Sequence, residues 1–265
     1  MKKMLTVLGV LGIGVAFAAN VPDSQWKGKR VAFLGDSITD KSHVCCSTNY
    51  WGFLDAMLGI QPLVYGINGH QMSRIKAQAE QLRAEHGEDV DAIFIFAGTN
   101  DYFADTPLGK WWDYTLEPSN WRLSKELAPK RVPAMDEGTF RGRINIALDY
   151  IKDHFPDAQV ILLTPLHRGY AYFGGNNSQS PECFGNPRGL HIDDYVEVIK
   201  EAGDIWSVPV INLYGISGLY PMKDSYVKCF GDAKNDRLHP NTEGHRRIAE
   251  TIKYQILAMP STFRK

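Results

Sequence analysis

Ser37 and His239 are the residues of this sequence whose types and settings could supply a nucleophile and its base. Ser37 stands in the stretch VAFLGDSITD, residues 31–40, directly after an apolar run with the length of a buried strand. A serine at the end of a strand, ahead of a helix, exposes its hydroxyl near backbone N–H groups that stabilise negative charge. Alone, the string Gly-Asp-Ser is more often a turn or a helix cap, so the assignment needs support from elsewhere.

A serine hydroxyl is a weak nucleophile unless a base accepts its proton and a third group orients that base. Among the eight histidines, His239 has the neighbours that this chemistry needs. Asp236 precedes it by three residues, within reach of one ring nitrogen if the segment turns, and Pro240 fixes the chain directly after it. Asn241 can then cap the last helix.

Acyl transfer also needs hydrogen-bond donors for the oxyanion of a tetrahedral intermediate. The candidates are the backbone N–H of Ser37, the backbone N–H of Gly69 and the side-chain amide of Asn100. Gly69 suits this role because a residue without a side chain lets a substrate approach its amide. As alternatives, Gly69 is an ordinary loop glycine and Asn100 caps the next turn.

These residues must be positioned by the elements around them. Short apolar runs without polar alternation alternate with amphipathic stretches, a pattern typical of a parallel sheet covered by helices on both faces. We expect strands at 30–34, 63–65, 92–96, 160–164 and 208–212, and helices at 51–58, 72–85, 139–154, 193–205 and 242–257. Ligands bind at the carboxyl ends of the strands in such sheets, which is where Ser37, Gly69 and Asn100 fall.

An insertion at about 102–136 interrupts this pattern and is expected to lie over the sheet edge. Its aromatic side chains could stack on sugar rings at the rim of the site, although a small core of the insertion itself is the favoured explanation. They are Trp111, Trp112, Trp121, Tyr102 and Tyr114. A second loop, at about 168–188, follows the fourth strand, and the side chains there that could contact a substrate are Arg168, Tyr170 and Tyr172.

The blocks GDSIT at 35–39, Gly69, GTND at 98–101 and DRLH at 236–239 resemble, in order and position, those of the SGNH or GDSL-type hydrolase family. The resemblance implies a flavodoxin-like three-layer α/β/α sandwich with a central parallel sheet. It implies Ser37 as nucleophile, Gly69 and Asn100 as oxyanion donors, and His239 as base supported by Asp236. It also implies that no metal or other cofactor takes part.

Two features set limits on this resemblance. Family members often carry an asparagine two residues ahead of the G-x-x-G of the second block, and here that position is Val64, a change that concerns loop bracing more than chemistry. The Gly-x-Ser-x-Gly nucleophile elbow is absent, which argues against an ordinary α/β-hydrolase.

The first residues predict export. Lys2 and Lys3 precede an apolar run that ends in Ala16-Phe17-Ala18, so residues 1–18 read as a signal peptide cleaved near Ala18/Ala19. The run is shorter than the roughly 20 residues that cross a bilayer. We therefore expect a secreted or periplasmic protein, with a single domain over residues 19–265 and no membrane contact after cleavage.

Export bears on the four cysteines, because thiols in an oxidising compartment tend to pair. The α-carbons of Cys45 and Cys46 lie only about 3.8 Å apart, which is short for a disulfide. We expect each of them to pair with Cys183 or Cys229, in an order that the sequence leaves open; four buried free thiols are the alternative.

Composition narrows the class of substrate. The net charge is −1 and there is no long Lys/Arg block, so a nucleic-acid partner is not expected. We expect a small-molecule or glycan ester as substrate, most plausibly O-acetyl groups on carbohydrate, with a short-chain lipid ester or a thioester as the alternative. Acyl chain length, the identity of the alcohol and the oligomeric state stay open.

Two other classes compete with an esterase. The Gly-Asp and Gly-Thr-Asn-Asp strings faintly resemble those of dinuclear metallophosphoesterases, but the upstream Asp-x-His of such sites is missing. A non-catalytic secreted carbohydrate-binding domain is the other candidate. Against it stands the complete set of five site residues.

Overall fold

The computed structural model describes residues 24–42, 46–119 and 126–263 of the chain. The expected signal peptide and its cleavage site therefore lie outside the described residues, as do Cys45 and Trp121.

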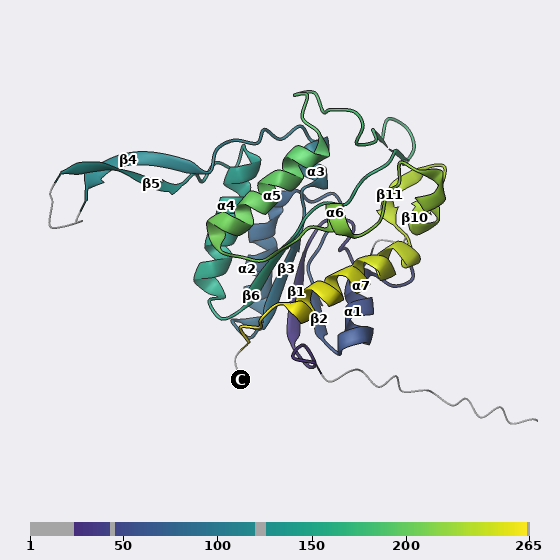
Figure 1. Ribbon diagram of the computed structural model, residues 1–265, viewed down its shortest axis with the longest axis horizontal. Coiled ribbons are helices and arrows are strands. Elements are labelled where there is room, and N and C mark those ends of the chain that lie inside the picture. Colours follow the sequence, from purple (N-terminus) through teal and green to yellow (C-terminus); the bar gives the residue numbers. More distant parts are fainter. Residues whose placement is uncertain (1–23, 43–45, 120–125, 264–265) are drawn as a thin grey trace, which may run out of the picture.

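A parallel sheet of five strands forms the centre of the molecule, as expected (Figure 1). Its order is β2-β1-β3-β6-β9, and every neighbouring pair is parallel. This is the strand order of flavodoxin-like folds. The strands are β1 (Arg30–Gly35), β2 (Gln61–Val64), β3 (Ala92–Phe96), β6 (Gln159–Leu163) and β9 (Val210–Ile211). The last strand is shorter than the expected 208–212, and the others agree to within two residues.

Helices cover both faces of the sheet and make it the middle of three layers (Figure 1). One face carries α2 (Ile75–His86), α4 (Phe140–His154) and α5 (Ile192–Trp206), and the other carries α1 (Tyr50–Leu58) and α7 (Thr242–Ala258). Alternate residues of β1 enter the two cores, Ala32 and Leu34 on one side and Val31 and Phe33 on the other. A strand buried on both faces needs apolar residues at every position, which explains the uninterrupted apolar runs.

Short elements occupy the connections at the carboxyl ends of the strands. They are η1 (Met72–Arg74), which begins the expected helix at 72–85 as a 3₁₀ turn, and α3 (Thr99–Phe103), α6 (Leu213–Ile216) and η3 (Asp224–Cys229). α3 directly follows Gly98, whose φ of 128° is outside the range that residues with a side chain favour.

A second sheet, which the sequence pattern did not predict, lies beside the first. It is antiparallel, with the order β10-β11-β7-β8. The strands are β7 (Ala171–Tyr172), β8 (Ser178–Gln179), β10 (Phe230–Asp232) and β11 (Asp236–Pro240). β7, β8 and β10 have only two or three residues, too few to show an alternating pattern, and β7 and β8 lie inside the segment expected to be a loop at about 168–188.

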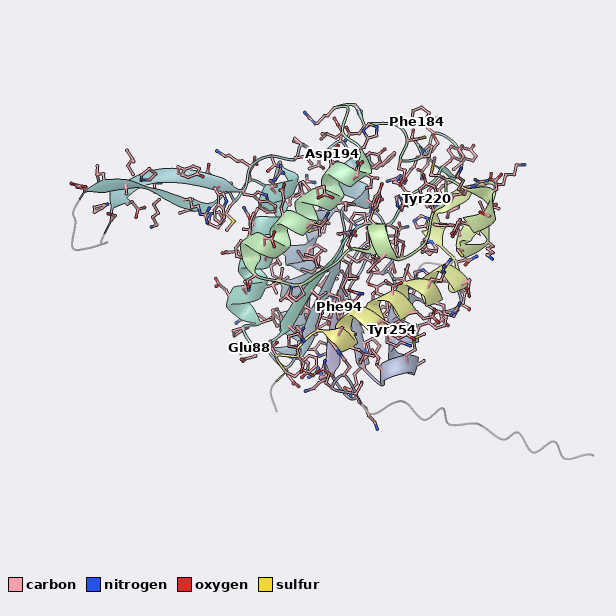
Figure 2. The ribbon with its side chains drawn as sticks, viewed as in Figure 1. Glu88, Phe94, Phe184, Asp194, Tyr220 and Tyr254 are labelled. Carbon is pink, nitrogen blue, oxygen red and sulfur yellow. The ribbon has the colours of Figure 1, made fainter. Side chains whose placement is uncertain are left out.

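The insertion is an antiparallel hairpin of β4 (Trp112–Pro118) and β5 (Leu127–Pro133) that projects away from the body (Figures 1 and 2). The expectation that its aromatic residues form a small core is wrong for the described ones. Tyr114 is 67% exposed, and Arg131 stacks on the Trp112 ring. Trp111 instead packs against the main core and donates a hydrogen bond to Glu201 of α5.

The described cysteines do not pair with one another: Cys46, Cys183 and Cys229 are all free thiols. Cys183 is exposed and Cys229 is buried. The expected disulfides of Cys46 are therefore wrong, and those of Cys45 lie outside the described residues. Within the described ranges, no helix combines the length and apolar character needed to cross a membrane.

Candidate active site

The chain turns sharply at Asp36, directly after β1, and this turn presents Ser37. The N–H groups of Thr39 and Asp40 both donate to the Asp36 carbonyl, at 3.0 and 2.9 Å. The N–H of Ile38 donates to the Asp36 carboxyl, also at 3.0 Å. These bonds hold the Ser37 side chain, 5% exposed, at the carboxyl edge of the sheet.

The structure brings His239 to Ser37 although 202 positions separate them in the chain. The Nε2 atom of His239 lies 3.0 Å from the Ser37 Oγ, and its Nδ1 lies 2.9 Å from Oδ2 of Asp236. An ionised carboxylate only accepts, so Nδ1–H donates to Asp236 and Nε2 is left to accept the Ser37 hydroxyl proton. This is the geometry of a nucleophile, its base and the group that orients the base.

Asp236 is held in its ionised form by several donors at once. Its Oδ1 atom accepts hydrogen bonds from the backbone N–H groups of Leu238 and His239, at 3.1 and 3.0 Å. Burial raises the pKa of Asp236, but the ring and backbone N–H groups of His239, with that of Leu238, outweigh burial and leave the pKa below its usual range. The carboxylate therefore fixes both the backbone turn and the tautomer of the imidazole.

The segment carrying Asp236 is strand β11, which is not among the strands expected from the sequence. Asp236 pairs with Ala171 of β7, so the second sheet fixes its backbone from the side. The strand ends at Pro240, and the next residue, Asn241, caps α7 as expected. Its side chain accepts from the N–H groups of Glu243 and Gly244 at 3.1 and 3.2 Å. Strand and helix cap together fix both ends of this segment.

Gly69 lies in the loop after β2 with a φ of 77°, which favours glycine. No atom lies within 4 Å of the place where a Cβ would stand, so the space beside this residue is open. Within the described residues, the N–H groups of Ser37 and Gly69 donate to no other protein group. Both therefore remain available to a ligand.

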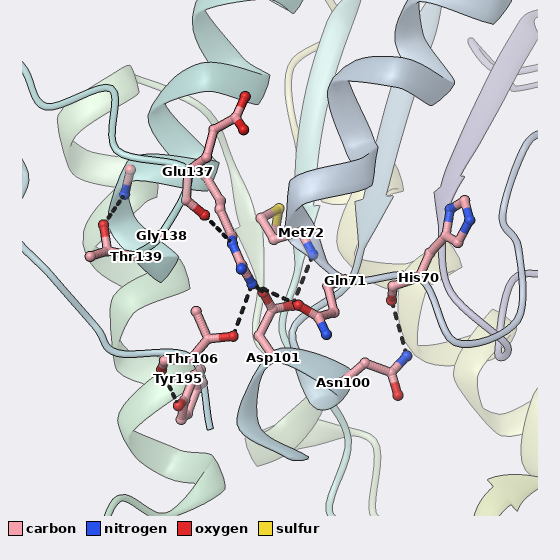
Figure 3. Close-up of polar contacts among 12 residues, drawn as sticks. His70, Gln71, Met72, Asn100, Asp101, Thr106, Glu137, Gly138, Thr139 and Tyr195 are labelled. Carbon is pink, nitrogen blue, oxygen red and sulfur yellow. Dashed lines mark hydrogen bonds and ion pairs between the residues drawn. The ribbon is translucent and has the colours of Figure 1, made fainter. Parts of the chain in front are cut away.

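Asn100, in α3, is attached to the same loop (Figure 3). Its amide Nδ2 donates to the carbonyl of His70, the residue after Gly69, at 3.0 Å. An amide nitrogen carries two hydrogens, so one remains for a ligand. The roles of Gly69 and Asn100 as oxyanion donors stay predictions, but the structure links the two residues.

Asp101, in α3, joins that helix to the segment after β2 and to α4. Its importance was missed in the sequence although it ends the GTND block. It is buried, and its Oδ2 atom accepts from the N–H of Met72 at 2.8 Å (Figure 3). Its Oδ1 accepts from Nη1 of Arg143 on α4, also at 2.8 Å. Burial raises the pKa of Asp101 despite these donors.

Gln78 of α2 gave no sequence signal, yet it fixes the end of β1. Its Oε1 accepts from the N–H of Gly35 and its Nε2 donates to the carbonyl of Gly35, both at 2.8 Å. The same Nε2 lies 3.0 Å from Nδ1 of His70. No sequence motif predicts these contacts, because only the folded backbone places the side chain of Gln78 opposite Gly35.

One aromatic side chain, that of Phe173 directly after β7, lies beside the catalytic histidine candidate. The Phe173 ring lies 5.5 Å from the His239 ring and is 44% exposed. Tyr170 and Tyr172, expected from the sequence as possible substrate contacts, are each 42% exposed on β7 or next to it. Across the described ranges there is no group of three or more His, Cys, Asp or Glu side chains that could hold a metal ion.

A hydroxyl, an imidazole and a carboxylate joined at the carboxyl edge of a parallel sheet are typical of a serine hydrolase. Comparison with known proteins agrees. The sequence model of the GDSL-like lipase/acylhydrolase family matches residues 33–247, so the chain belongs to that family and is a hydrolase of carboxylic esters. A search of curated protein sequences finds no match.

Several solved structures resemble the whole fold. A protein from Lactobacillus plantarum is 27% identical with a TM-score of 0.68, over 87% of this chain and 97% of its own. A possible lipase from Chitinophaga pinensis is 18% identical with a TM-score of 0.61, over 86% of this chain and 99% of its own. A variant of Axe2, an acetyl-xylooligosaccharide esterase from Geobacillus stearothermophilus, is 20% identical with a TM-score of 0.52, over 90% of this chain and 98% of its own.

Proposed function

We propose that the protein is a serine esterase that works through an acyl-enzyme formed on Ser37. The observation that carries this proposal is the pair of contacts on His239, 3.0 Å to the Ser37 Oγ and 2.9 Å to Asp236. The catalytic mutants described for the structurally similar Axe2 also replace a serine, an aspartate and a histidine.

His239 accepts the proton of Ser37 while the Ser37 Oγ attacks the ester carbonyl. The oxyanion that forms is bound by the N–H groups of Ser37 and Gly69 and by the Asn100 amide. The protonated imidazole then gives its proton to the leaving alcohol. Water attacks the acyl-enzyme by the same steps in the next half-reaction, and the acid is released.

We propose O-acetylated carbohydrate as the substrate. Two observations support this choice. The exposed Phe173 ring beside His239 offers a flat apolar face to a sugar ring, and the similar fold of Axe2 belongs to an acetyl-xylooligosaccharide esterase. A short-chain lipid esterase or thioesterase is the second candidate. Both fit the proposed export to the periplasm or the medium after cleavage near Ala18.

A panel of esters tests the proposal. Purified protein is assayed on aryl acetate, butyrate and octanoate, on an acetyl thioester and on acetylated xylooligosaccharides, each beside Ser37→Ala. We expect kcat/KM to be highest for acetyl groups on sugars and to fall by several orders of magnitude in the variant. A preference for octanoate would contradict the carbohydrate substrate, and an unchanged Ser37→Ala variant would contradict the nucleophile.

A further inference from the structure

Arg168 is a large charged side chain that is only 1% exposed, directly behind the site. Its Nη1 atom donates two hydrogen bonds to Thr99, one to the carbonyl and one to Oγ1, both at 3.0 Å. Its Nη2 donates to Gln179 of β8, and its backbone N–H donates to the Glu182 carboxylate at 2.9 Å. Arg168 therefore links the second sheet to the residue before Asn100.

The buried guanidinium also faces the turn that carries the nucleophile. Arg168, Thr99 and Asp36 line one small cavity of about 10 Å³, the space of roughly one water molecule. The Nε atom of Arg168 is buried and meets no acceptor among the described residues. The positive charge lowers the pKa of Asp36 against the larger effect of burial. Burying arginine with an unused donor is unfavourable, so packing alone does not account for this residue.

The turn that Arg168 contacts has little stability of its own. α3 has five residues, far fewer than an isolated helix needs, and no side chain caps its start at Gly98. Outside contacts hold three successive side chains instead: Thr99 by Arg168, Asn100 by the His70 carbonyl and Asp101 by Met72 and Arg143.

We propose that Arg168 is a positioning residue, which holds Thr99 so that the Asn100 amide points at the oxyanion. The inference rests on the proposed function, because it requires Asn100 to be an oxyanion donor. A displacement of about 1 Å in such a donor lowers the rate by about 100-fold, so the contact to Thr99 has a direct effect on kcat. Arg168, expected from the sequence as a possible substrate contact, is instead buried, and none of its hydrogen bonds among the described residues reaches Ser37.

A double-mutant cycle with a small aryl acetate tests this role. We expect Arg168→Met to lower kcat by about 100-fold and to change KM by less than about three-fold. In the Asn100→Ala background the same substitution is expected to lower kcat by less than about three-fold, because the donor that it positions is already gone. Arg168→Lys, which keeps the positive charge and an N–H donor group, is expected to recover part of the loss.

The outcomes separate this inference from the proposed function. If Asn100→Ala leaves kcat unchanged, its assignment as an oxyanion donor fails. If Asn100→Ala lowers kcat but Arg168→Met causes the same fold loss in both backgrounds, or acts on KM alone, only the positioning role fails.

A milder pair of variants applies if Arg168→Met does not fold. Thr99→Val removes one of the two acceptors and keeps the size of the side chain, whereas Thr99→Ser keeps the hydroxyl. We expect Thr99→Val to lower kcat by about 10-fold at constant KM, with Thr99→Ser recovering most of it. Equal kcat in the valine and serine variants would overturn the inference.

Discussion

At the scale of single residues, Asp236 performs two tasks that one substitution can separate. Its Oδ1 atom holds the backbone N–H groups of Leu238 and His239, and its Oδ2 accepts from the imidazole. An asparagine in its place still offers one acceptor oxygen for the backbone. It presents a donor, not an acceptor, to the ring.

We therefore expect Asp236→Asn to lower kcat by about 10²- to 10⁴-fold, because the wrong tautomer of His239 faces Ser37. The melting temperature should fall by only a few degrees, because the backbone contacts survive. Asp232→Asn is the matched control, an exposed carboxyl on β10 that also accepts a backbone N–H. Loss of activity in both variants, or in neither, would contradict the separate role of Asp236.

The raised pKa of Asp36 predicts how the stability of the folded protein depends on pH. Burial raises the pKa of Asp36 to about 7. The Ile38 N–H, His239 and Arg168 oppose this rise, and Asp101 adds to it. Between about pH 4 and pH 7 the folded chain keeps a proton that the unfolded chain has released. The contribution of Asp36 to the free energy of unfolding therefore falls as the pH rises through this range.

Urea unfolding of the protein and of Asp36→Asn, from pH 4 to pH 8, measures this contribution. We expect the difference in unfolding free energy to shift in favour of the variant as the pH rises, and to level off above about pH 7. A difference that stays constant with pH would show that Asp36 titrates like an ordinary carboxyl.

At the scale of elements, the strands and helices that carry the core could be predicted because their pattern is strong. β1 and β3 are apolar at nearly every position. The bounds of the amphipathic helices around them lie within one residue of those expected, except that the 3₁₀ turn η1 precedes α2, which begins at Ile75. The strands of the second sheet could not be predicted. β7, β8 and β10 have only two or three residues, too few to show a period, and β7 and β10 are placed by pairing with β11.

The site shows the same division. The positions of Ser37 and Asn100 were predictable because their blocks follow strands whose ends meet at one edge of the sheet. His239 was predictable because an aspartate precedes it by three residues. The side chains that hold these site residues in place could not be predicted. Gln78 and Arg143 act from helix faces, and no spacing in the sequence tells such a residue from an ordinary polar one.

The hairpin β7–β8 leads to a prediction on substrate choice, because it carries Phe173 next to His239. Phe184 and Tyr220 lie at the same end of the molecule (Figure 2). We expect Phe173→Ala to raise KM about 10-fold for an acetylated oligosaccharide and to leave kcat/KM for aryl acetate within about two-fold, from the loss of a stacking face. Tyr114→Ala, at an aromatic residue of the distant hairpin that is 67% exposed, is the control. Equal effects on the two substrates would argue against a sugar contact at this ring.

At the scale of the whole molecule, the β4–β5 hairpin stands apart from the catalytic layers. It leaves the body on the side of α4 and α5, whereas β11 with His239 lies on the opposite side (Figure 1). Its two ends are adjacent, since the N–H of Ala134 donates to the Trp111 carbonyl at 2.9 Å.

We expect a variant in which a short glycine-containing turn replaces residues 112–133 to fold and to keep kcat/KM for aryl acetate within about two-fold, because the deleted residues lie far from the site. Circular dichroism and ester kinetics give the readout. A variant that folds but loses activity would show that the insertion forms part of the site, as the alternative of a sugar-stacking rim requires.

The central claim is that Ser37 forms a covalent acyl-enzyme with the help of His239, and trapping that adduct tests it most directly. The protein is treated with an aryl phosphonate ester, digested and analysed by mass spectrometry, beside His239→Ala and Ser37→Ala. The expected result is one stoichiometric adduct on the peptide that contains Ser37, formed far more slowly without the imidazole and absent without the hydroxyl. An unlabelled Ser37 in a fully active preparation, or an adduct elsewhere that abolishes activity, would contradict it.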